Sequence, residues 1–221
     1  RSKYHTATEG AMIIFSDSHI DNGHGVFAPH KKRFHNFLDF AEKEQLVIAG
    51  DLFEWWRFSP EETMAKNMDV IIRLQSFGDR LTITPGNHDL RVALLQVMFP
   101  KAKVVPAFVA HGWTIMHGHK TDPLLDTKTE RAVAAISARV IHALKMEWVD
   151  SIVERMTSSK RANEPYVQEL MKNPIQFKFI IGHTHVPLQL DRFVNTGSIS
   201  NEEATYVLLT ADGKAKLKKF K

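Results

Sequence analysis

Histidine, aspartate and asparagine residues that could bind metal ions are gathered in five short motifs along this chain. The motifs, in order, are Asp17-Ser18-His19, Gly50-Asp51, Gly86-Asn87-His88-Asp89, His117-Gly118-His119 and Gly182-His183-Thr184-His185. Imidazole nitrogens and carboxylate or amide oxygens bind Mn, Fe, Zn, Co and Ni ions. Because the chain has no cysteine, a metal site on it must use such nitrogen and oxygen ligands. The motifs therefore indicate metal chemistry, provided that the fold brings them together.

The last motif suits two metal ions rather than one. It follows the apolar run 177–181, which predicts a buried strand, and Pro187 closes the segment. Two imidazoles on alternate residues just past a strand end, His183 and His185, can point into one cavity without sharing a single metal tightly. An H-x-H pattern alone also occurs on ordinary protein surfaces, so its interpretation depends on what the other strand ends supply.

Three more apolar runs place the earlier motifs at strand ends as well. Residues 11–15, 46–49 and 81–84 predict short buried strands, and helical patterns that begin at Pro29 and after Ser59 separate them. This βαβαβ order predicts parallel strands with right-handed crossovers. In such sheets a site lies beyond the carboxyl ends of the strands. Each of the three runs ends in residues suited to metal binding or acid–base chemistry.

The two helices are expected to cover the sheet with their apolar faces. A capping box, Ser59-Pro60-Glu61-Glu62, starts the second of them. The residues expected to face the core are Phe34, Phe37, Leu38 and Ala41 in the first helix and Met64, Met68, Ile71 and Ile72 in the second.

The second half of the chain combines hairpins with a helical insertion. The predicted elements, in order, are a short helix at 91–98, a hairpin of 104–110 and 113–116, helices over about 126–156 and 163–172, and two final strands around the turn Asp212-Gly213. The hairpin ends in the motif that contains His117. The two longer helices form an insertion before the strand at 177–181.

Length and composition indicate one globular domain over residues 1–221. The chain is 43% hydrophobic and 24% charged, and no apolar run is long enough to span a bilayer. A net charge of +4 and a pI of about 9.2 fit a phosphate substrate or a polyanionic partner, although lysines within 214–221 supply much of the excess. The absence of cysteine fits a reducing compartment, so we expect a cytoplasmic protein. The chain starts at Arg1 rather than Met, which leaves an upstream segment open.

In this order the five motifs resemble the full signature of the calcineurin-like metallophosphoesterases, over roughly the whole chain. The resemblance implies a four-layer α/β/β/α sandwich of two mixed sheets, with a helical cap insertion at about 122–174. The expected activity is hydrolysis of a phosphodiester or pyrophosphate bond by attack of a metal-activated hydroxide.

The resemblance also implies a role for each motif residue. One divalent metal ion would be held by Asp17, His19, Asp51 and His185, and the other by Asp51, Asn87, His117 and His183. Manganese is the metal expected first, with iron, zinc, cobalt and nickel as alternatives. The residues themselves also suggest Asp51 as the bridging carboxylate, because it follows a glycine that lets the backbone turn sharply. His88, paired with Asp89, would protonate or stabilise the leaving oxygen.

A closer resemblance is to the UDP-2,3-diacylglucosamine pyrophosphohydrolases of lipid A synthesis. It rests on residues 50–55, on 117–118 followed by a helical insertion, and on 182–187. Two positions depart from that group, which usually has Arg in place of His88 and Asp in place of His119. The expected substrate is a UDP-sugar-lipid-like molecule or a nucleotide, and peripheral contact with a membrane is left open.

Three residues are candidates for contacts with the substrate. Trp55, with Trp56, could form a platform for a base or an acyl chain, or could pack the loop against the cap helices. His24 lies in the loop after the first motif and could reach the substrate. His119 would face away from His117 if the strand continues, so a supporting or surface role is as well founded as substrate contact.

Two other functions fit parts of the pattern. A nuclease of the same superfamily would account for the basic pI, although no long basic patch with interleaved aromatic residues occurs outside the tail. A non-catalytic scaffold with this fold, as in the retromer subunit, would lack the acid that His88 represents. We therefore expect a phosphorylated small molecule as the partner, ahead of nucleic acid.

Overall fold

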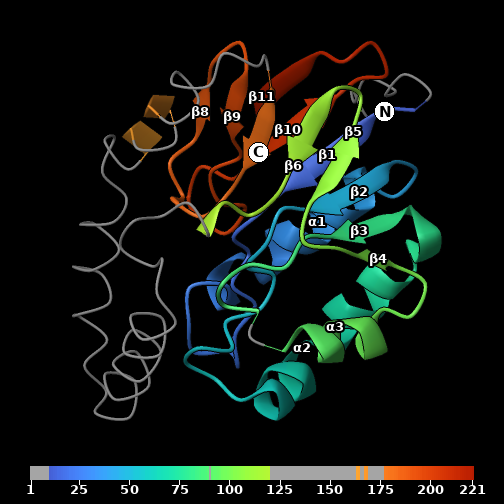
Figure 1. Cartoon of the computed structure of the whole chain (residues 1–221). Coiled ribbons are helices and arrows are strands. Elements are labelled where there is room, and N and C mark those ends of the chain that lie inside the picture. Colours follow the sequence, from blue (N-terminus) through green and yellow to red (C-terminus); the bar gives the residue numbers. More distant parts are fainter. Residues whose placement is uncertain (1–9, 90, 120–162, 165–166, 169–176) are drawn as a thin grey trace.

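Two mixed β-sheets form the framework of the computed structural model, which describes residues 10–89, 91–119, 163–164, 167–168 and 177–221 (Figure 1). In spatial order, the first sheet contains β11 (Ala215–Lys219), β10 (Thr205–Leu209), β1 (Met12–Phe15), β2 (Gln45–Ile48), β3 (Leu81–Ile83) and β4 (Lys103–Val104). The second sheet contains β5 (Phe108–Ala110), β6 (Trp113–Ile115), β7 (Phe179–Ile181), β9 (Phe193–Asn195) and β8 (Leu188–Gln189). The predicted class, an α/β fold with two mixed sheets, is confirmed.

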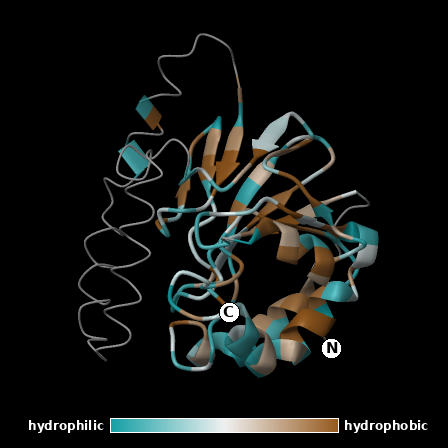
Figure 2. Cartoon of the chain, turned by 60° about the horizontal axis from the view of Figure 1, so that its bottom comes forward, coloured by the Kyte–Doolittle hydropathy of each residue, from teal (hydrophilic) through white to brown (hydrophobic). Residues whose placement is uncertain are grey.

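The central strands of the first sheet, such as β1, are apolar on both faces because both faces are covered. In β1, Ile13 and Phe15 pack toward the helices, while Met12 and Ile14 pack toward the second sheet. This alternation explains why the sequence of β1 is a continuous apolar run rather than an alternating one. Figure 2 shows the hydrophobic colour in the strands and also on the helices.

Helices cover the outer face of the first sheet. They are the 3-10 turn η1 (Ala28–His30), α1 (Lys31–Phe40), α2 (Pro60–Gln75), the 3-10 turn η2 (Gly78–Arg80) and α3 (Val92–Met98) (Figure 1). Phe34 and Phe37 of α1 pack edge-on against Phe15, with ring centroids 5.6 and 5.3 Å away. The predicted inward face of α1 is therefore confirmed, since Phe34, Phe37, Leu38 and Ala41 are all buried.

The inward face predicted for α2 is partly wrong. Met68 and Ile72 are 46% and 58% exposed, whereas Val70 and Leu74 are fully buried. Asn67 is also buried, because its side chain donates to the carbonyls of Asp21 and Thr63, and its backbone is locally non-helical. A satisfied polar residue thus lies on the core face, and a search for apolar residues alone misplaced that face.

The parallel order of the first three strands is as predicted. β1 pairs with β2, and β2 with β3, all in parallel, so their carboxyl ends lie at one edge of the sheet. In the second sheet β6, β7 and β9 are also parallel. The final hairpin of β10 and β11 is confirmed as an antiparallel pair.

The predicted hairpin of 104–110 with 113–116 needs one correction. Val104 belongs to β4, which pairs with β3 in the first sheet, and only Phe108–Ala110 pairs with β6. Pro106 lies between the two strands, where a residue without an N–H group cannot continue a ladder. The chain passes from one sheet to the other at this point.

The helical cap falls almost entirely outside the described residues. The helices expected over about 126–156 and 163–172, and the single-domain boundaries 1–221 with a cap at about 122–174, stay predictions. Within the part of the chain that the structure describes, no helix is both long and apolar enough to cross a bilayer.

Candidate metal centre

The five motifs meet where strands of both sheets end. Asp17 and His19 follow β1, Asp51 follows β2, Asn87 and His88 follow β3, His117 follows β6, and His183 and His185 follow β7. Backbone hydrogen bonds join these loops: the N–H of Asp17 donates to Gly50 at 3.0 Å, and that of Gly182 donates to His117 at 3.1 Å. Residues distant in sequence are therefore held side by side by main-chain contacts.

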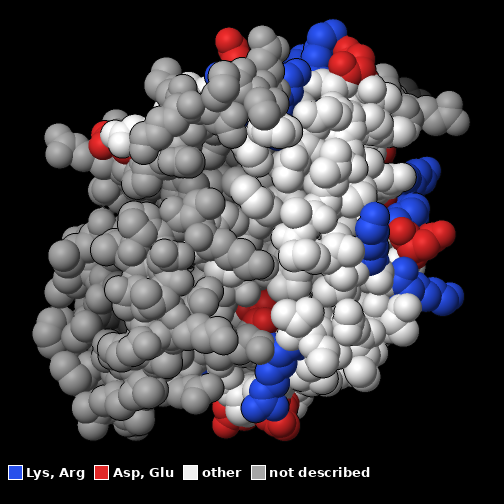
Figure 3. All heavy atoms as spheres, viewed as in Figure 1, with Lys and Arg blue, Asp and Glu red and all other residues white. Residues whose placement is uncertain are grey.

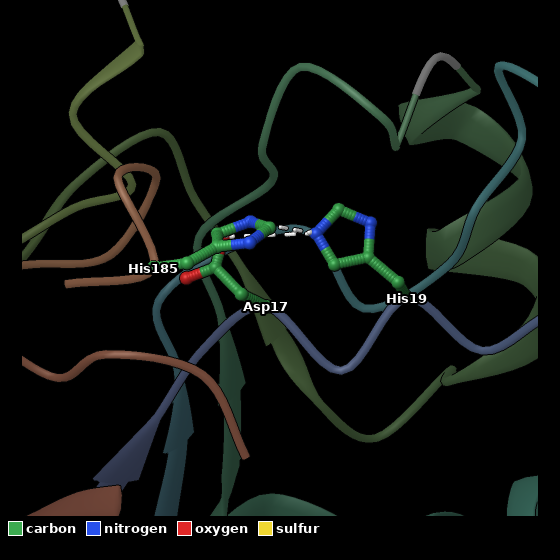
Figure 4. Close-up of side chains that lie close together, drawn as sticks. All are labelled: Asp17, His19 and His185. Carbon is green, nitrogen blue, oxygen red and sulfur yellow. Dashed lines mark hydrogen bonds and ion pairs between the residues drawn. The ribbon is translucent and has the colours of Figure 1, made fainter. Parts of the chain in front are cut away.

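One group of potential ligands consists of Asp17, His19 and His185, whose donor atoms lie within 4.8 Å of one another. The two imidazoles face each other beside the carboxylate (Figure 4). Asp17 Oδ1 lies 3.2 Å from His185 Nε2 and 3.8 Å from His19 Nε2.

A second group consists of Asp51, His117 and His183, again with donor atoms within 4.8 Å, and a third combination, His19, Asp51 and His88, lies where the two groups meet. Asp51 Oδ2 lies 3.0 Å from His117 Nε2 and 3.9 Å from His19 Nε2 of the first group. Asn87 Oδ1 lies 3.0 Å from His117 Nε2. The structure thus brings all seven predicted ligands together, with Asp51 between the groups and with His183 and His185 in different groups.

Backbone strain is concentrated in these residues. The non-glycine residues with positive φ in the described part of the chain are Asp17, His19, Asp51, His111, His183 and His185. Of these, only His111 lies elsewhere, in the turn between β5 and β6. A left-handed conformation costs about 1–3 kcal/mol for such residues and persists only where the surrounding structure imposes it. Five of the seven candidate ligands therefore have a strained backbone conformation, which sets the direction of their side chains.

Three motif glycines are required by close approach, and one of them is Gly86, where a Cβ would overlap Asp51. A Cβ at Gly50, whose φ is +90°, would overlap the His117 ring. A Cβ at Gly182 would overlap Ser16 and Asp17. The glycines of Gly50-Asp51 and of the last motif therefore let loops of different sheets come close enough for their ligands to meet.

The buried charges of the centre stabilise one another. Burial would raise the pKa of Asp51, but His117 and His88 hold it well below its usual range. Burial would also raise the pKa of Asp17, and His185 and His19 lower it instead. In return, Asp51 raises the pKa of His117 to about 9, although burial opposes this. A divalent cation can replace such protons, because its ligands must be deprotonated to bind it.

Glu54 is a site residue that the sequence interpretation missed. Its two carboxylate oxygens accept hydrogen bonds from His19 Nδ1 and His88 Nδ1, both at 2.8 Å. Burial would raise the pKa of Glu54, but His88 and His19 lower it, so the carboxylate is ionised. The sequence did contain a sign of this role, since Glu54 is the one charged residue in the run 52–56.

Asp89 is not the partner of His88, and that prediction is wrong. Its carboxylate accepts from the backbone N–H groups of Phe53, Leu52 and Gly86, at 3.0, 3.3 and 3.0 Å. Burial and the nearby charge of Asp51 raise the pKa of Asp89. Asp89 thus supports the backbone around Asp51, while Glu54 contacts the imidazole.

The two tryptophans after this motif have different positions. Trp55 is 1% exposed and stacks on Phe53 in the core, with ring centroids 4.8 Å apart, so it does not form a substrate platform, and its packing against the cap helices stays a prediction. Trp56 stacks on His88 at 4.1 Å, and its Nε1 donates to the carbonyl of Asn87 at 2.6 Å. Trp56 therefore holds two residues of the Gly-Asn-His-Asp motif.

The remaining substrate candidates lie at different distances from the centre. β6 ends at Ile115, so the strand does not continue, and the His119 ring lies 5.4 Å from that of His117 and 6.5 Å from that of His183. His24 is exposed on its loop and belongs to none of the groups of potential ligands.

The residues present fit a pair of divalent metal ions. Because the Glu54 carboxylate can only accept, His19 Nδ1 must carry a proton, so a neutral His19 would present the lone pair of Nε2 to a metal ion. That Nε2 lies 3.1 Å from His185 Nε2, beside the Asp17 carboxylate. A cation between the facing imidazoles would satisfy both nitrogens and the carboxylate together.

Comparisons with known proteins identify the family of the chain. A family model described as calcineurin-like phosphoesterase matches residues 12–210. Solved structures with a similar chain course include a predicted phosphoesterase of Streptococcus pneumoniae TIGR4, at 14% identity, with 97% of this chain and 99% of that chain covered and a TM-score of 0.37. The phosphoesterase Yfce of E. coli is 17% identical, with 96% of this chain and 100% of that chain covered and a TM-score of 0.47. The cold-active protein-tyrosine phosphatase of a Shewanella species is 11% identical, with 96% of this chain and 80% of that chain covered and a TM-score of 0.43. No protein of curated function matches the chain.

Proposed function

Because the chain belongs to the calcineurin-like phosphoesterase family, we propose that it hydrolyses a phosphodiester or pyrophosphate bond with two divalent metal ions. The observation that carries the proposal is the position of Asp51. Its Oδ2 lies between two groups of ligands, close to His117 of one and to His19 of the other. A single carboxylate within reach of two sets of imidazoles suits a pair of adjacent metal ions better than two separate sites.

Each metal ion would be held by ligands from both sheets. The first would be held by Asp17, His19, Asp51 and His185, and the second by Asp51, Asn87, His117 and His183. When bound, such a pair polarises a phosphoryl oxygen and lowers the pKa of a water molecule. Nitrogen and oxygen donors without thiolate make manganese the metal to test first, followed by iron, zinc, cobalt and nickel.

His88 is the residue that we assign to the leaving group. Glu54 accepts from His88 Nδ1, which leaves Nε2 directed to the side of Asp51, 3.9 Å from its Oδ2. As the bond from phosphorus to the leaving oxygen breaks, a proton on His88 Nε2 passes to that oxygen. Stacking on Trp56 and the bond to Glu54 fix the ring, so that the imidazole needs little reorganisation.

The substrate class rests on resemblance and on surface charge. The motifs at residues 50–55 and 182–187 favour a pyrophosphate such as a UDP-sugar lipid, and His119 lies near enough to His117 to contact the substrate. A nuclease is less well supported. Figure 3 shows Lys and Arg side chains along the rim of the molecule with Asp and Glu beside them, rather than a continuous basic track on the described part of this face.

A substrate panel tests the proposal. Manganese-loaded protein is assayed with bis-p-nitrophenyl phosphate, p-nitrophenyl phosphate, UDP-sugars and single-stranded DNA. We expect the diester or the UDP-sugars to be hydrolysed fastest, and His88→Ala to keep its metal ions while its turnover falls about 10²- to 10⁴-fold. Fastest cleavage of DNA would favour the nuclease, and no hydrolysis of any substrate would favour the scaffold. An unchanged rate in His88→Ala would refute the role of His88.

A further inference from the structure

Asn163 is a buried residue that belongs to the insertion but contacts the loop of the last motif. It is 2% exposed. Its Oδ1 accepts from Thr184 Oγ1 at 2.9 Å, and its Nδ2 donates to the carbonyl of Val186 at 2.9 Å. Thr184 lies between the two candidate ligands His183 and His185, and Val186 follows them. A residue about 20 positions upstream therefore holds the middle and the end of this loop.

Asn195, at the end of β9, completes the network from the other side. The two hydrogens of its Nδ2 are shared among three acceptors, namely Asn163 Oδ1 and Thr184 Oγ1, both at 2.9 Å, and the carbonyl of Gly182 at 2.8 Å. The carbonyls at both ends of the loop, Gly182 and Val186, are thus each held by a side-chain amide. All these polar groups are paired in a buried region, where an unpaired group would be unfavourable.

The packing beside Asn163 gives the same segment a second attachment. Val167 packs against Ile181, the last residue of β7, and against Phe193 of β9. Figure 1 shows residues 163–164 and 167–168 at the side of the second sheet near β8. The segment therefore lies against the strands that carry the loop, through an apolar contact as well as through hydrogen bonds.

The loop needs such support because its backbone is strained at both histidines. His183 has a φ of 72° and His185 a φ of 57°. Residues other than glycine hold this conformation only when their surroundings impose it. His183 N also donates to the Asp17 carboxylate, but that contact fixes only the beginning of the loop. The network of Asn163 and Asn195 fixes its middle and its end.

We propose that Asn163 is a positioning residue for the metal centre, which acts through Thr184 and Val186 to direct His183 and His185 toward the two metal ions. The inference rests on the proposed function in one respect, namely that these histidines bind metal. It goes further in assigning part of the metal affinity to a residue of the insertion. Side chains that orient metal ligands typically change metal affinity about 10- to 100-fold when they are removed.

The test is the affinity of metal-free protein for Mn²⁺, measured by isothermal titration calorimetry. We expect Asn163→Ala to bind Mn²⁺ at least about tenfold more weakly than the wild type. Thr184→Val, which removes the hydroxyl but keeps the shape, should also weaken binding, whereas Thr184→Ser should restore it. The matched control is Gln75→Ala, which loses the hydrogen bond from Gln75 to the carbonyl of Met98, outside the metal centre. It should leave the affinity unchanged.

The Mn²⁺ electron paramagnetic resonance spectrum supplies a second readout, since a merely structural loss would not change the coordination of the metal. If Asn163→Ala does not fold, the pair Thr184→Val and Thr184→Ser decides the question. Wild-type affinity and spectrum in Asn163→Ala, or equal affinities in the two Thr184 variants, would overturn the inference and leave the proposed function standing. If the variants bind Mn²⁺ more weakly but the wild type hydrolyses no phosphoester, the inference is supported and the proposed function is refuted. A wild type that binds no metal refutes both.

Discussion

Glu54 connects the proposed metal site with the proposed acid. One oxygen of its carboxylate accepts from His19 and the other from His88, so both imidazoles carry their protons on Nδ1. Each Nε2 is then open to another role: that of His19, as a lone pair, can bind a metal ion, and that of His88, when it carries a second proton, can protonate the leaving oxygen. A carboxylate that binds the far nitrogen of a metal-binding imidazole fixes both its tautomer and its orientation.

Replacing Glu54 by Gln tests this connection. A glutamine has one accepting oxygen, so its amide N–H group would face one of the two imidazole donors. We expect turnover to fall about 10- to 100-fold, with weaker binding of one of the two Mn²⁺ ions. Steady-state kinetics and metal analysis of the purified variant measure both effects.

Asp89→Asn is the comparison for that variant. It should lower stability by about 1–3 kcal/mol, because one of its backbone donors loses its acceptor, and should change turnover less than Glu54→Gln does. If Asp89→Asn lost more turnover than Glu54→Gln at equal metal content, Asp89 rather than Glu54 would be the partner of His88.

His117 predicts how pH affects the metal-free protein. Its pKa is raised to about 9 in the folded state, above the value of about 6.5 of an unperturbed histidine. The stability that protonated His117 contributes is therefore fully present below pH 6.5 and is lost as the pH rises toward 9. Urea unfolding in the presence of a chelator should show this decrease.

The same proton competes with the metal, so Mn²⁺ affinity should rise over the same pH range. His117→Asn should flatten the stability decrease. A wild-type stability that stays constant or increases between pH 6.5 and 9 would contradict the assigned interaction between His117 and Asp51.

At the scale of the elements, the turns after the strands determine how closely the ligands approach. Gly50 and Gly112 allow a matched test, because both have a positive φ, of +90° and +80°. A Cβ added at Gly50 would overlap the His117 ring, whereas a Cβ added at Gly112 would meet no atom within 4 Å. Alanine at either position should lose about 1–2 kcal/mol of stability from the left-handed backbone. Gly50→Ala should lose more, and should also bind Mn²⁺ more weakly, because its Cβ would displace the His117 ring.

Urea unfolding and calorimetric titration of both glycine variants check this prediction. Equal losses of stability with unchanged Mn²⁺ affinity would mean that the approach of β2 to the His117 loop does not depend on a glycine.

Elements with a regular apolar pattern could be predicted from the sequence, and elements shaped by polar contacts could not. The parallel strands β1 to β3 and the inward face of α1 follow from continuous apolar runs and from a periodic stripe. The face of α2 was misplaced because Asn67 is buried by its hydrogen bonds to Asp21 and Thr63, which no periodicity of apolar residues reveals.

In the site, too, some residues could be predicted from the sequence and others could not. Asp17, Asp51 and the histidines could be located because each follows a strand. The partner of His88 could not, because adjacency in sequence pointed to Asp89, whereas the turn after β3 directs that side chain to the backbone of Leu52 and Phe53. Only the spatial arrangement brings Glu54 to His88.

At the scale of the whole molecule, the metal centre joins the two sheets. The first sheet supplies Asp17, His19, Asp51 and Asn87, and the second supplies His117, His183 and His185. The sheets also pack through an apolar layer that includes Ile14, Val47, Ile115 and Ile180. Metal binding to the folded state alone should therefore stabilise the contact between the sheets.

We propose that two metal ions at this junction hydrolyse a phosphoester. The most direct measurement is the rate of hydrolysis of bis-p-nitrophenyl phosphate, or of the fastest substrate of the panel, by chelator-treated protein as Mn²⁺ is added in known equivalents. We predict negligible activity without metal, a rise that ends at two equivalents per chain, and no recovery in Asp51→Ala. Full activity without metal, saturation at one equivalent, or recovery in Asp51→Ala would contradict the two-metal account.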